Sequence, residues 1–396
     1  MFVYILAIAN RTSFGVAGLV AAERFNTSAT VLSLFVVVQL FVYAFMQLPA
    51  GMALDRWGAR RLIITGAIAM TVGQLVMAFV PSVGLALGAR VLIGAGDATI
   101  FVSAVRLVWE WFPAPRVPLL TQMTGLAGNI GQLISAYPFA AALAGVGWYF
   151  AFGGLAALTA LTALVALLTI RQSTATAHGG ASKSSFRAAV MNPATWLGFF
   201  THMLCGLSAT VFIMMWGVPF MRQGLGYGER ETAFALTLVV LTALVVAPVI
   251  GQLTAKFPQR RTMTALIIGG LVCVGWAIML VPTTPLPYWI FAVAIVLIAI
   301  GGPASLIGLD LAGSFNQPER RSTVQGIANM GGFVAAILVM LTVGVILDRR
   351  TGADSPALGD YRAALSVVFI PMILAALGVI VFRNKTRRSL TTETGF

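Results

Sequence analysis

The sequence predicts an all-α polytopic membrane protein with about twelve transmembrane helices in two six-helix halves. Three observations support this fold class. The chain of 396 residues is 59% hydrophobic and only 9% charged, whereas an average soluble domain carries roughly 25% charged residues. Apolar stretches of about 20 residues, the length that spans a bilayer, recur along the whole chain. The chain also contains an internal repeat with an offset of about half its length.

The apolar stretches follow one another with short polar breaks. In order, helices are expected over residues 1–22, 28–50, 62–80, 84–112, 118–141, 145–170, 193–221, 230–255, 263–281, 286–314, 323–346 and 361–382. Met1 is followed directly by apolar residues, with no positively charged leader and no small-residue cleavage site. The sequence therefore predicts no signal peptide, and a first helix that is truncated at its start.

The formal net charge of +13 raises the question of a nucleic-acid partner. If the chain starts in the cytoplasm, sixteen of the 25 Lys and Arg residues lie on the cytoplasmic side, six lie outside, and Arg11, Arg90 and Arg106 fall inside helices. This is a positive-inside bias. It predicts a multi-pass protein of the inner or plasma membrane, in contact with the lipid bilayer, with both termini cytoplasmic and no nucleic-acid partner.

Domain boundaries follow from the one long polar stretch. Residues 171–187, rich in Ser, Thr, Gly and Ala, divide the expected helices six and six, and such a composition is typical of a linker. We expect an N-terminal bundle over 1–170, a cytoplasmic linker over 171–191, and a C-terminal bundle with a short basic tail over 192–396. Cys205 and Cys273 fall in separate helices, so a structural disulfide has little support.

The internal repeat is visible in two places. The segment from Gly51 to Arg61 (GMALDRWGARR) recurs 200 residues later as GQLTAKFPQRR, and Gly125-Leu-Ala recurs 201 residues later as Gly326-Ile-Ala. Two matches at nearly one offset indicate duplication. A duplication of this kind predicts two parallel halves related by an axis along the membrane normal, a binding site near the midplane, and alternating access by rocking.

The first copy reads G-x-x-x-D-R-x-G-x-R-R, which resembles the signature cytoplasmic loop of the major facilitator superfamily. The resemblance extends over the whole chain and implies that the loop acts as a cytoplasmic gate. Gly51 allows close helix approach, Gly58 permits a tight turn, and Asp55 can pair with Arg or cap a helix. The gate residues would also include Arg56, Arg60 and Arg61, unless these are only positive-inside anchors. In the second copy Ala255 and Pro258 replace the acid and the glycine.

Ionisable side chains at membrane depth cost roughly 2.5 to 3.5 kcal/mol each on insertion scales and are functional hypotheses by default. Here they are Arg11, Arg90, Asp97, Arg106, Glu110, His202 and Asp310. Arg106 and Glu110 are four residues apart and can reach one another. They are expected near the cytoplasmic end, so we assign them to the gate, with Asp310 as a second acid.

Arg90 and Asp97 lie seven residues apart on one face of the expected fourth helix. Arg90-x-x-x-Gly94-x-Gly96 resembles a superfamily motif whose Arg is associated with proton coupling. Together with Asn10-Arg11, this pair is similar to the anion:cation symporter family. That resemblance implies that Arg11 and Arg90 hold an anionic substrate group and that Asp97 carries the coupling proton. The alternative is a structural ion pair between Arg11 and Asp97. Asn10 stands where that family has an acid.

Further polar and aromatic positions lie on helices that line the cavity in this superfamily. Those assigned to the substrate site are Asn10, Gln39, Tyr43, Asn129, Gln132 and Asn329; Gln122, Tyr137 and Trp216 share the pattern. Each could instead hold helices together by hydrogen bonds. His202 could relay protons, although a lone His in a helix is more often a hydrogen-bonded packing residue.

These observations predict a secondary active transporter, working as a monomer, that couples protons to a small organic anion such as a carboxylate. The alternative is a proton-driven efflux antiporter, but residues 128–132 lack the Pro of the helix-5 motif of such antiporters. Nitrate porters carry substrate Arg residues in helices 2 and 8, where this chain has none. There is no His-Glu-x-x-His or Gly-x-Ser-x-Gly motif and only two His residues. We therefore expect no enzyme activity, metal or cofactor; a non-transporting sensor remains open.

Overall fold

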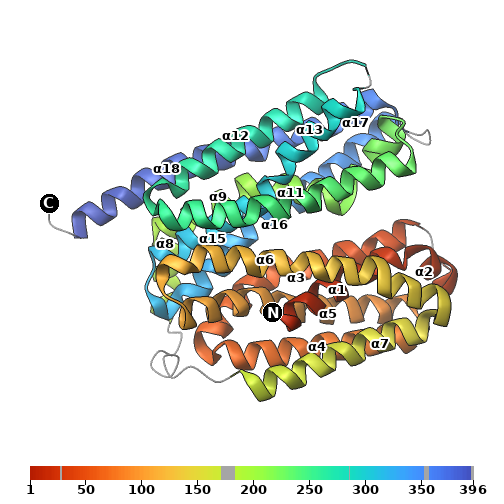
Figure 1. Cartoon of the computed structure of the whole chain (residues 1–396), viewed down its shortest axis with the longest axis horizontal. Helices are drawn as coiled ribbons and strands as arrows, with labels where there is room; N and C mark the ends of the chain where they lie inside the picture. Colours follow the sequence, from red (N-terminus) through yellow and green to blue (C-terminus); the bar gives the residue numbers. More distant parts are fainter. Residues whose placement is uncertain (27–28, 171–182, 285, 352–355, 394–396) are drawn as a thin grey trace. The chain divides into compact units, whose positions relative to one another are not determined.

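The computed structural model describes residues 1–26, 29–170, 183–284, 286–351 and 356–393. All regular elements within these ranges are helical, as the all-α class predicts (Figure 1). Ten helical stretches among the described residues are long and apolar enough to cross a membrane. A bilayer leaves no water to satisfy backbone N–H and C=O groups, so helices that bond internally are the expected spanning elements.

The structure differs from the expected helices in two places. The first, expected over 1–22, is broken at Ala17 into α1 (Phe2–Val16) and α2 (Gly18–Phe25). The fifth and sixth run together as one helical stretch, Ala114–Thr169, which is bent at Gly147, where φ is +83°. This left-handed backbone conformation suits glycine and interrupts the helix axis. The count of about twelve spans stays a prediction.

The chain divides into two compact units, each described by itself. Unit 1 comprises residues 1–117, 123–187 and 317–326. The helices of the N-terminal half, besides α1 and α2, are α3 (Ala29–Trp57), α4 (Ala59–Phe79), α5 (Val83–Trp111), η1 (Ala114–Arg116), α6 (Val117–Ile134), the π-helical segment η2 (Ser135–Phe139), α7 (Ala140–Thr169) and α8 (Lys183–Met191). Helix α5 packs against α1, α3 and α4, and α1 also packs against α7. Helix α5 is therefore the centre of unit 1.

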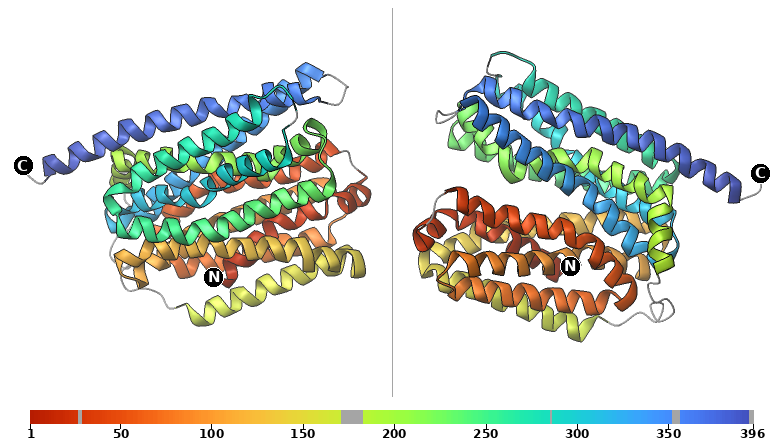
Figure 2. Two further views of the ribbon diagram at one scale, coloured as in Figure 1. Left: turned by 45° about the horizontal axis from the view of Figure 1, so that its top comes forward. Right: turned by 180° about the vertical axis from the view of Figure 1, so that it is seen from behind.

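Unit 2 comprises residues 118–122, 188–316 and 327–396. The helices of the C-terminal half are α9 (Pro193–Val211), η4 (Phe212–Trp216), α10 (Gly217–Pro219), η5 (Phe220–Gly224), α11 (Glu229–Lys256), η6 (Pro258–Arg260), α12 (Arg261–Leu280), α13 (Tyr288–Ala299), α14 (Gly301–Ala304), α15 (Leu306–Ser314), η7 (Pro318–Arg320), α16 (Arg321–Thr351), α17 (Leu358–Leu365), η8 (Ser366–Val368) and α18 (Phe369–Glu393). Helix α9 packs against α12, α14, α15 and α18. Helix α18 extends past its neighbours in this unit (Figure 2).

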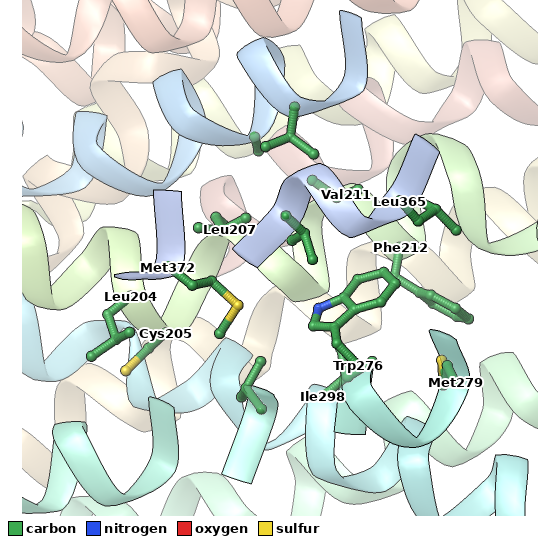
Figure 3. Close-up of a cluster of buried hydrophobic side chains, with 14 of the residues drawn as sticks. Leu204, Cys205, Leu207, Val211, Phe212, Trp276, Met279, Ile298, Leu365 and Met372 are labelled. Carbon is green, nitrogen blue, oxygen red and sulfur yellow. The ribbon is translucent and has the colours of Figure 1, made fainter. Parts of the chain in front are cut away.

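The core of unit 2 is apolar. Figure 3 shows Cys205, Phe212, Trp276 and Met372 converging from α9, η4, α12 and α18. Trp276 is fully buried. Both cysteines are free. Dense packing of apolar side chains fixes these helices relative to one another, since helices in a membrane gain little from hydrophobic burial alone.

The division differs from the expected domains in two short segments. Residues 118–122 belong to unit 2, and residues 317–326, which include the start of α16, belong to unit 1. Within the expected linker of 171–191, the structure has helix α8, whose last carbonyl groups accept bonds from Thr195 and Trp196. Residues 171–182 of the expected linker, and 394–396 of the expected basic tail, lie outside the described residues.

Candidate functional site

The centre of unit 1 holds a two-point ion pair between α1 and α5. The Nε of Arg11 donates to Oδ2 of Asp97 at 2.6 Å, and Nη2 donates to Oδ1 at 3.0 Å. The carboxylate is fully buried and the Arg11 side chain is 10% exposed. This fork geometry is the strong form of a charge-assisted hydrogen bond. In this structure Asp97 therefore occupies the donors that a bound anion would need.

Arg90 lies beside this pair but is not part of it. Its Nη1 and Nη2 donate to the backbone carbonyls of Asn10 and Arg11, at 3.3 and 3.1 Å. The guanidinium also lies 5.2 Å from the ring centroid of Phe14. None of the ion pairs among the described residues includes Arg90, and its Nε has no hydrogen-bond partner there. Arg90 is fully buried, so this positive charge is held by neutral carbonyl groups and an aromatic face.

Helix α3 contributes Tyr43 and Gln39 to the same region. The Arg11 guanidinium lies 4.2 Å from the centroid of the Tyr43 ring, a cation–π contact that steadies it. Gln39 is one turn before Tyr43, and its side-chain nitrogen and oxygen are both buried without a hydrogen-bond partner among the described residues. A Cβ added at Gly94 would lie 3.2 Å from the Gln39 Cγ. Gly94 shares the α5 face of Arg90 and Asp97, so Gln39 packs against that face.

Two aromatic residues of this cluster were not predicted. Phe14 contacts Arg90, as described above, and stacks on Phe35 at 4.4 Å between centroids. Tyr4 is buried on the same helix as Arg11, and its ring centroid lies 5.2 Å from that of Phe101 on α5. The signal was present in the helical spacing, because residues 4, 11 and 14 recur at intervals that share one face.

Asn10, predicted to bind substrate, faces a different helix. Its Nδ2 donates to the carbonyl of Leu6 at 2.7 Å and to Oγ1 of Thr159 on α7 at 2.8 Å. Both amide hydrogens are thereby used, and the side chain is fully buried. Neighbouring residues on a helix point about 100° apart, so Asn10 and Arg11 serve different interfaces. In this structure Asn10 links α1 to α7, and its assignment to the substrate site stays a prediction.

The other predicted lining residues lie on α6 and α16. Asn129 and Gln132 are half-buried on α6, next to Gly128 and Gly131, which contact α1. In unit 2, Asn329 is buried. The three residues that share the pattern have separate surroundings: Gln122 donates to the carbonyl of Pro303, Trp216 donates to the carbonyl of Met340, and Tyr137 is 70% exposed.

His202 lies in unit 2 between α9 and α16. Its Nδ1 accepts the backbone N–H of Gly332 at 3.1 Å, so the ring hydrogen of the neutral imidazole is on Nε2. Gly332 leaves the space for the ring, since a Cβ there would lie 2.7 Å from Nδ1. This placement agrees with the packing alternative for His202.

Three of the predicted gate residues, Asp55, Arg106 and Glu110, form a second cluster in unit 1. One carboxylate oxygen of Asp55, at the end of α3, accepts the backbone N–H of Ser322 at 3.0 Å. The other accepts the N–H of Thr323 at 2.8 Å and its hydroxyl at 2.6 Å. These amides begin α16 and would otherwise have no helical partner. Asp55 therefore caps α16 from another helix, where the positive end of the helix dipole favours a carboxylate.

Arg106 joins this cap from α5. Its Nε donates to Glu110 at 2.6 Å, and its Nη1 donates to the carbonyl of Pro318 at 2.9 Å and lies 3.5 Å from Asp55. Arg321 adds a cation–π contact with Trp109 at 4.2 Å. The structure brings Asp55, Arg106 and Glu110 together, and it adds the start of α16, which the sequence did not point to.

The two glycines of the motif have separate roles. A Cβ at Gly51 would lie 2.6 Å from the carbonyl oxygen of Ser322, so only glycine lets α3 and α16 approach this closely. Gly58 has φ +80° and turns the chain between α3 and α4, where other residues would be strained.

The remaining predicted gate residues lie outside this cluster. Arg60 donates to the carbonyl of Leu167 at 2.9 Å, near the end of α7, and Arg56 and Arg61 are exposed. Asp310 lies in unit 2, buried, with its Oδ1 unpartnered among the described residues. The side chain of Arg261 donates to the carbonyl of Thr254 and to the hydroxyl of Ser314.

The helical architecture has counterparts among known proteins. The family model described as Major Facilitator Superfamily matches residues 1–340 and 198–395, which together cover nearly the whole chain. The chain belongs to the major facilitator superfamily. It is therefore a transporter-type membrane protein, not an enzyme, as the sequence predicted.

Relatives within the superfamily include several transporters named for anions. A probable sulfoacetate transporter of Cupriavidus necator is 23% identical and aligns over 89% of this chain and 87% of its own. A probable L-galactonate transporter of Escherichia coli is 22% identical over 88% and 81%. A methylenomycin A resistance protein of Streptomyces coelicolor is 23% identical over 98% and 92%. The solved structure of the proton:xylose symporter XylE matches with a TM-score of 0.69 at 14% identity, over 95% and 92% of the chains, which supports the fold.

Proposed function

We propose that this superfamily member is a secondary active transporter that moves a small organic anion together with a proton by alternating access. One observation carries the proposal: the buried guanidinium of Arg90 lies beside the Arg11–Asp97 pair, so that two guanidinium groups occupy a region with a single carboxylate, which pairs with Arg11. A buried charge without a counter-ion costs free energy. A cluster with one surplus positive charge therefore favours binding of an anion.

The ion pair suggests how a proton is coupled to the anion. While Asp97 is ionised, it occupies the Arg11 fork, and an incoming carboxylate would meet its negative charge. Protonation of Asp97 frees the fork, but removing one partner of a buried pair costs roughly 3 to 5 kcal/mol if nothing replaces it. An anion that takes the place of Asp97 on Arg11 removes this cost. Proton and anion binding thus favour one another, and the effect is reciprocal.

The chemistry of the site supports a carboxylate or a sulfonate as the bound group. A planar guanidinium presents parallel donors that match a two-oxygen anion, and Arg11 already binds a carboxylate in this way. The relatives named for sulfoacetate and L-galactonate transport agree with this class. In this proposal the protein works as a monomer in the cytoplasmic membrane, with both termini and the Asp55 cap on the cytoplasmic side.

A transport assay tests the proposal. Purified protein in liposomes is given an inward proton gradient, and uptake of labelled carboxylates and sulfonates is followed together with internal pH. We expect accumulation of at least one anion above equilibrium, with proton entry, and no accumulation by Arg11→Gln or Arg90→Gln. Arg349→Gln, on the exposed end of α16, is the matched control. Anion uptake that persists in both cluster variants would refute the proposal.

Proton-driven efflux is the second candidate, because one relative that aligns over nearly the whole chain is named for antibiotic resistance. The same liposome assay distinguishes efflux from anion symport. An antiporter would expel a lipophilic compound while protons move the other way, and it would not require Arg11. Movement of lipophilic cations alone, without an effect of anions, would favour efflux.

A further inference from the structure

We infer that Gln39 selects anions that carry a hydroxyl group near the carboxylate or sulfonate, so that the substrate is a hydroxylated acid and not a plain alkyl acid. This inference rests on the proposed function, because it assigns the neutral part of the same site. It starts from a buried amide whose two polar atoms have no partner in the part of the chain that the structure describes.

The Gln39 side chain is buried against the face of α5 that carries Arg90 and Asp97. It is 1% exposed, and it packs on Gly94, whose added Cβ would lie 3.2 Å from the Gln39 Cγ and 2.8 Å from its carbonyl oxygen. Arg90 precedes Gly94 by four residues and Asp97 follows it by three, so all three share one face of α5. Tyr43, one turn after Gln39, holds the Arg11 guanidinium.

An unsatisfied buried amide is costly. A buried donor or acceptor left without a partner loses its hydrogen bonds to water, and buried side-chain polar atoms in proteins mostly have a partner. Gln39 leaves both Nε2 and Oε1 unpartnered among the described residues, beside the cluster that is proposed to receive the substrate. A ligand that bonds to both atoms would recover this free energy, and a ligand that bonds to neither would not.

The two atoms require different partners. Nε2 donates two hydrogen bonds, whereas Oε1 only accepts them. A second carboxylate would satisfy Nε2 but place negative charge near Oε1. A hydroxyl group both donates and accepts, so one or two hydroxyl groups can satisfy the whole amide. Together, the guanidinium groups and the amide match an acid with hydroxyl groups along its carbon chain.

The difference in affinity between a hydroxylated acid and its plain alkyl analogue should be large. A site that hydrogen-bonds a substrate hydroxyl strongly rejects an analogue without that hydroxyl, whereas an apolar pocket rejects an added group only weakly. For one amide we expect an effect of about ten- to hundredfold in affinity. This gain in affinity should require the Gln39 side chain and should not depend on the overall charge of the ligand.

Two matched acid pairs test the inference: D-glycerate against propanoate, and D-gluconate against hexanoate. Dissociation constants are measured by calorimetry on the purified full-length protein. We expect the wild type to bind at least one hydroxylated acid about tenfold or more tightly than its plain partner. In Gln39→Leu the hydroxylated acid should lose about ten- to hundredfold, while the plain acid stays within a few fold. Gln259→Leu, an exposed glutamine, should match the wild type.

The outcomes separate this inference from the proposed function. Equal affinity for both members of each pair, with Arg90 still required, overturns the role of Gln39 and leaves anion transport intact. If neutral D-sorbitol binds as tightly as D-gluconate, the anion site is refuted, while the proposed contact between the Gln39 amide and hydroxyl groups still holds. Failure of all four acids to bind refutes both. If Gln39→Leu does not fold, Gln39→Asn, which keeps the amide but withdraws it by one methylene group, should reduce the preference, and an unchanged preference contradicts the inference.

Discussion

Arg11 on α1 and Asp97 on α5 are joined by two hydrogen bonds of 2.6 and 3.0 Å, although they are 86 residues apart in sequence. Arg90, which shares the α5 face of Asp97, makes no such pair with any described residue and bonds to carbonyl groups of α1. The site therefore contains one guanidinium that has a counter-ion and one that does not. Anion binding and proton coupling should both depend on this difference.

Arg90→Lys should weaken anion binding about ten- to hundredfold, which is the size expected for lost hydrogen bonds to a charged group. Lys keeps the charge but lacks the planar fork and cannot hold the carbonyls of Asn10 and Arg11 together. Calorimetry with the tightest-binding anion measures this effect. The exposed Arg349→Lys is the control. Unchanged affinity in Arg90→Lys would show that Arg90 is a structural residue only.

Asp97→Asn should separate binding from coupling. In the wild type, anion affinity should rise as pH falls, because a proton on Asp97 releases Arg11. The amide of the variant cannot take up that proton, so the variant should bind the anion with an affinity that does not change with pH, and it should equilibrate substrate without accumulating it. Calorimetry at several pH values and uptake into liposomes check both parts. The exposed Asp348→Asn serves as control; a retained pH dependence in Asp97→Asn would contradict the coupling role.

Asp55→Ala should release the start of α16. Loss of a capping side chain typically costs about 1 kcal/mol, and here three hydrogen bonds to Ser322 and Thr323 are lost at once. We expect faster amide exchange at these two residues, by about tenfold, a slower transport cycle, and anion affinity within a few fold of the wild type. Hydrogen-exchange mass spectrometry and turnover measure this. Arg56→Gln, which alters an exposed cation, should leave the exchange unchanged; if it has the same effect, the cap is not the cause.

Gly131→Ala should destabilise unit 1 more than Gly153→Ala. An added Cβ would lie 2.1 Å from the carbonyl oxygen of Ile5 and 2.9 Å from the Cβ of Ile8, so α6 would have to move away from α1. Overpacking typically costs about 1 to 3 kcal/mol, and a clear fall in melting temperature is expected. Gly153→Ala is the matched control, because nothing among the described residues lies within 4 Å of its added Cβ. Equal melting temperatures would show that α6 can shift freely.

The cluster of Arg11, Arg90 and Asp97 shows which features of a functional site can be predicted from sequence. Arg11, Arg90 and Asp97 were found because an ionisable residue in an apolar helix is conspicuous, and the i to i+7 spacing placed two of them on one face. The direction of Asn10 could not be found in this way. Its contact with Thr159 depends on how α1 is rotated against α7, which the approach of α6 through Gly128 and Gly131 helps to fix.

For the gate, too, the sequence predicted a residue but not its partners. The motif identified Asp55 as a capping or pairing residue, but its partners at Ser322 and Thr323 lie 267 and 268 residues further along the chain. Free amides at a helix start carry no side-chain signature, so the sequence could not name which helix Asp55 caps. Gln39 is a similar case: its polarity was visible in the sequence, whereas the lack of partners for both amide atoms among the described residues appeared only with its surroundings.

The all-α membrane class, the superfamily and the charged residues of interest could all be predicted without a structure. They depend on local hydropathy and on motifs, because an apolar segment in a bilayer must satisfy its own backbone as a helix wherever it lies in the chain. The partners of these charged residues could be identified only in the folded chain. Asp97 pairs with Arg11, Asp55 with the start of α16, and Arg90 with neutral carbonyl groups. These pairings depend on the depth, rotation and close approach of packed helices, which short-range sequence patterns do not specify.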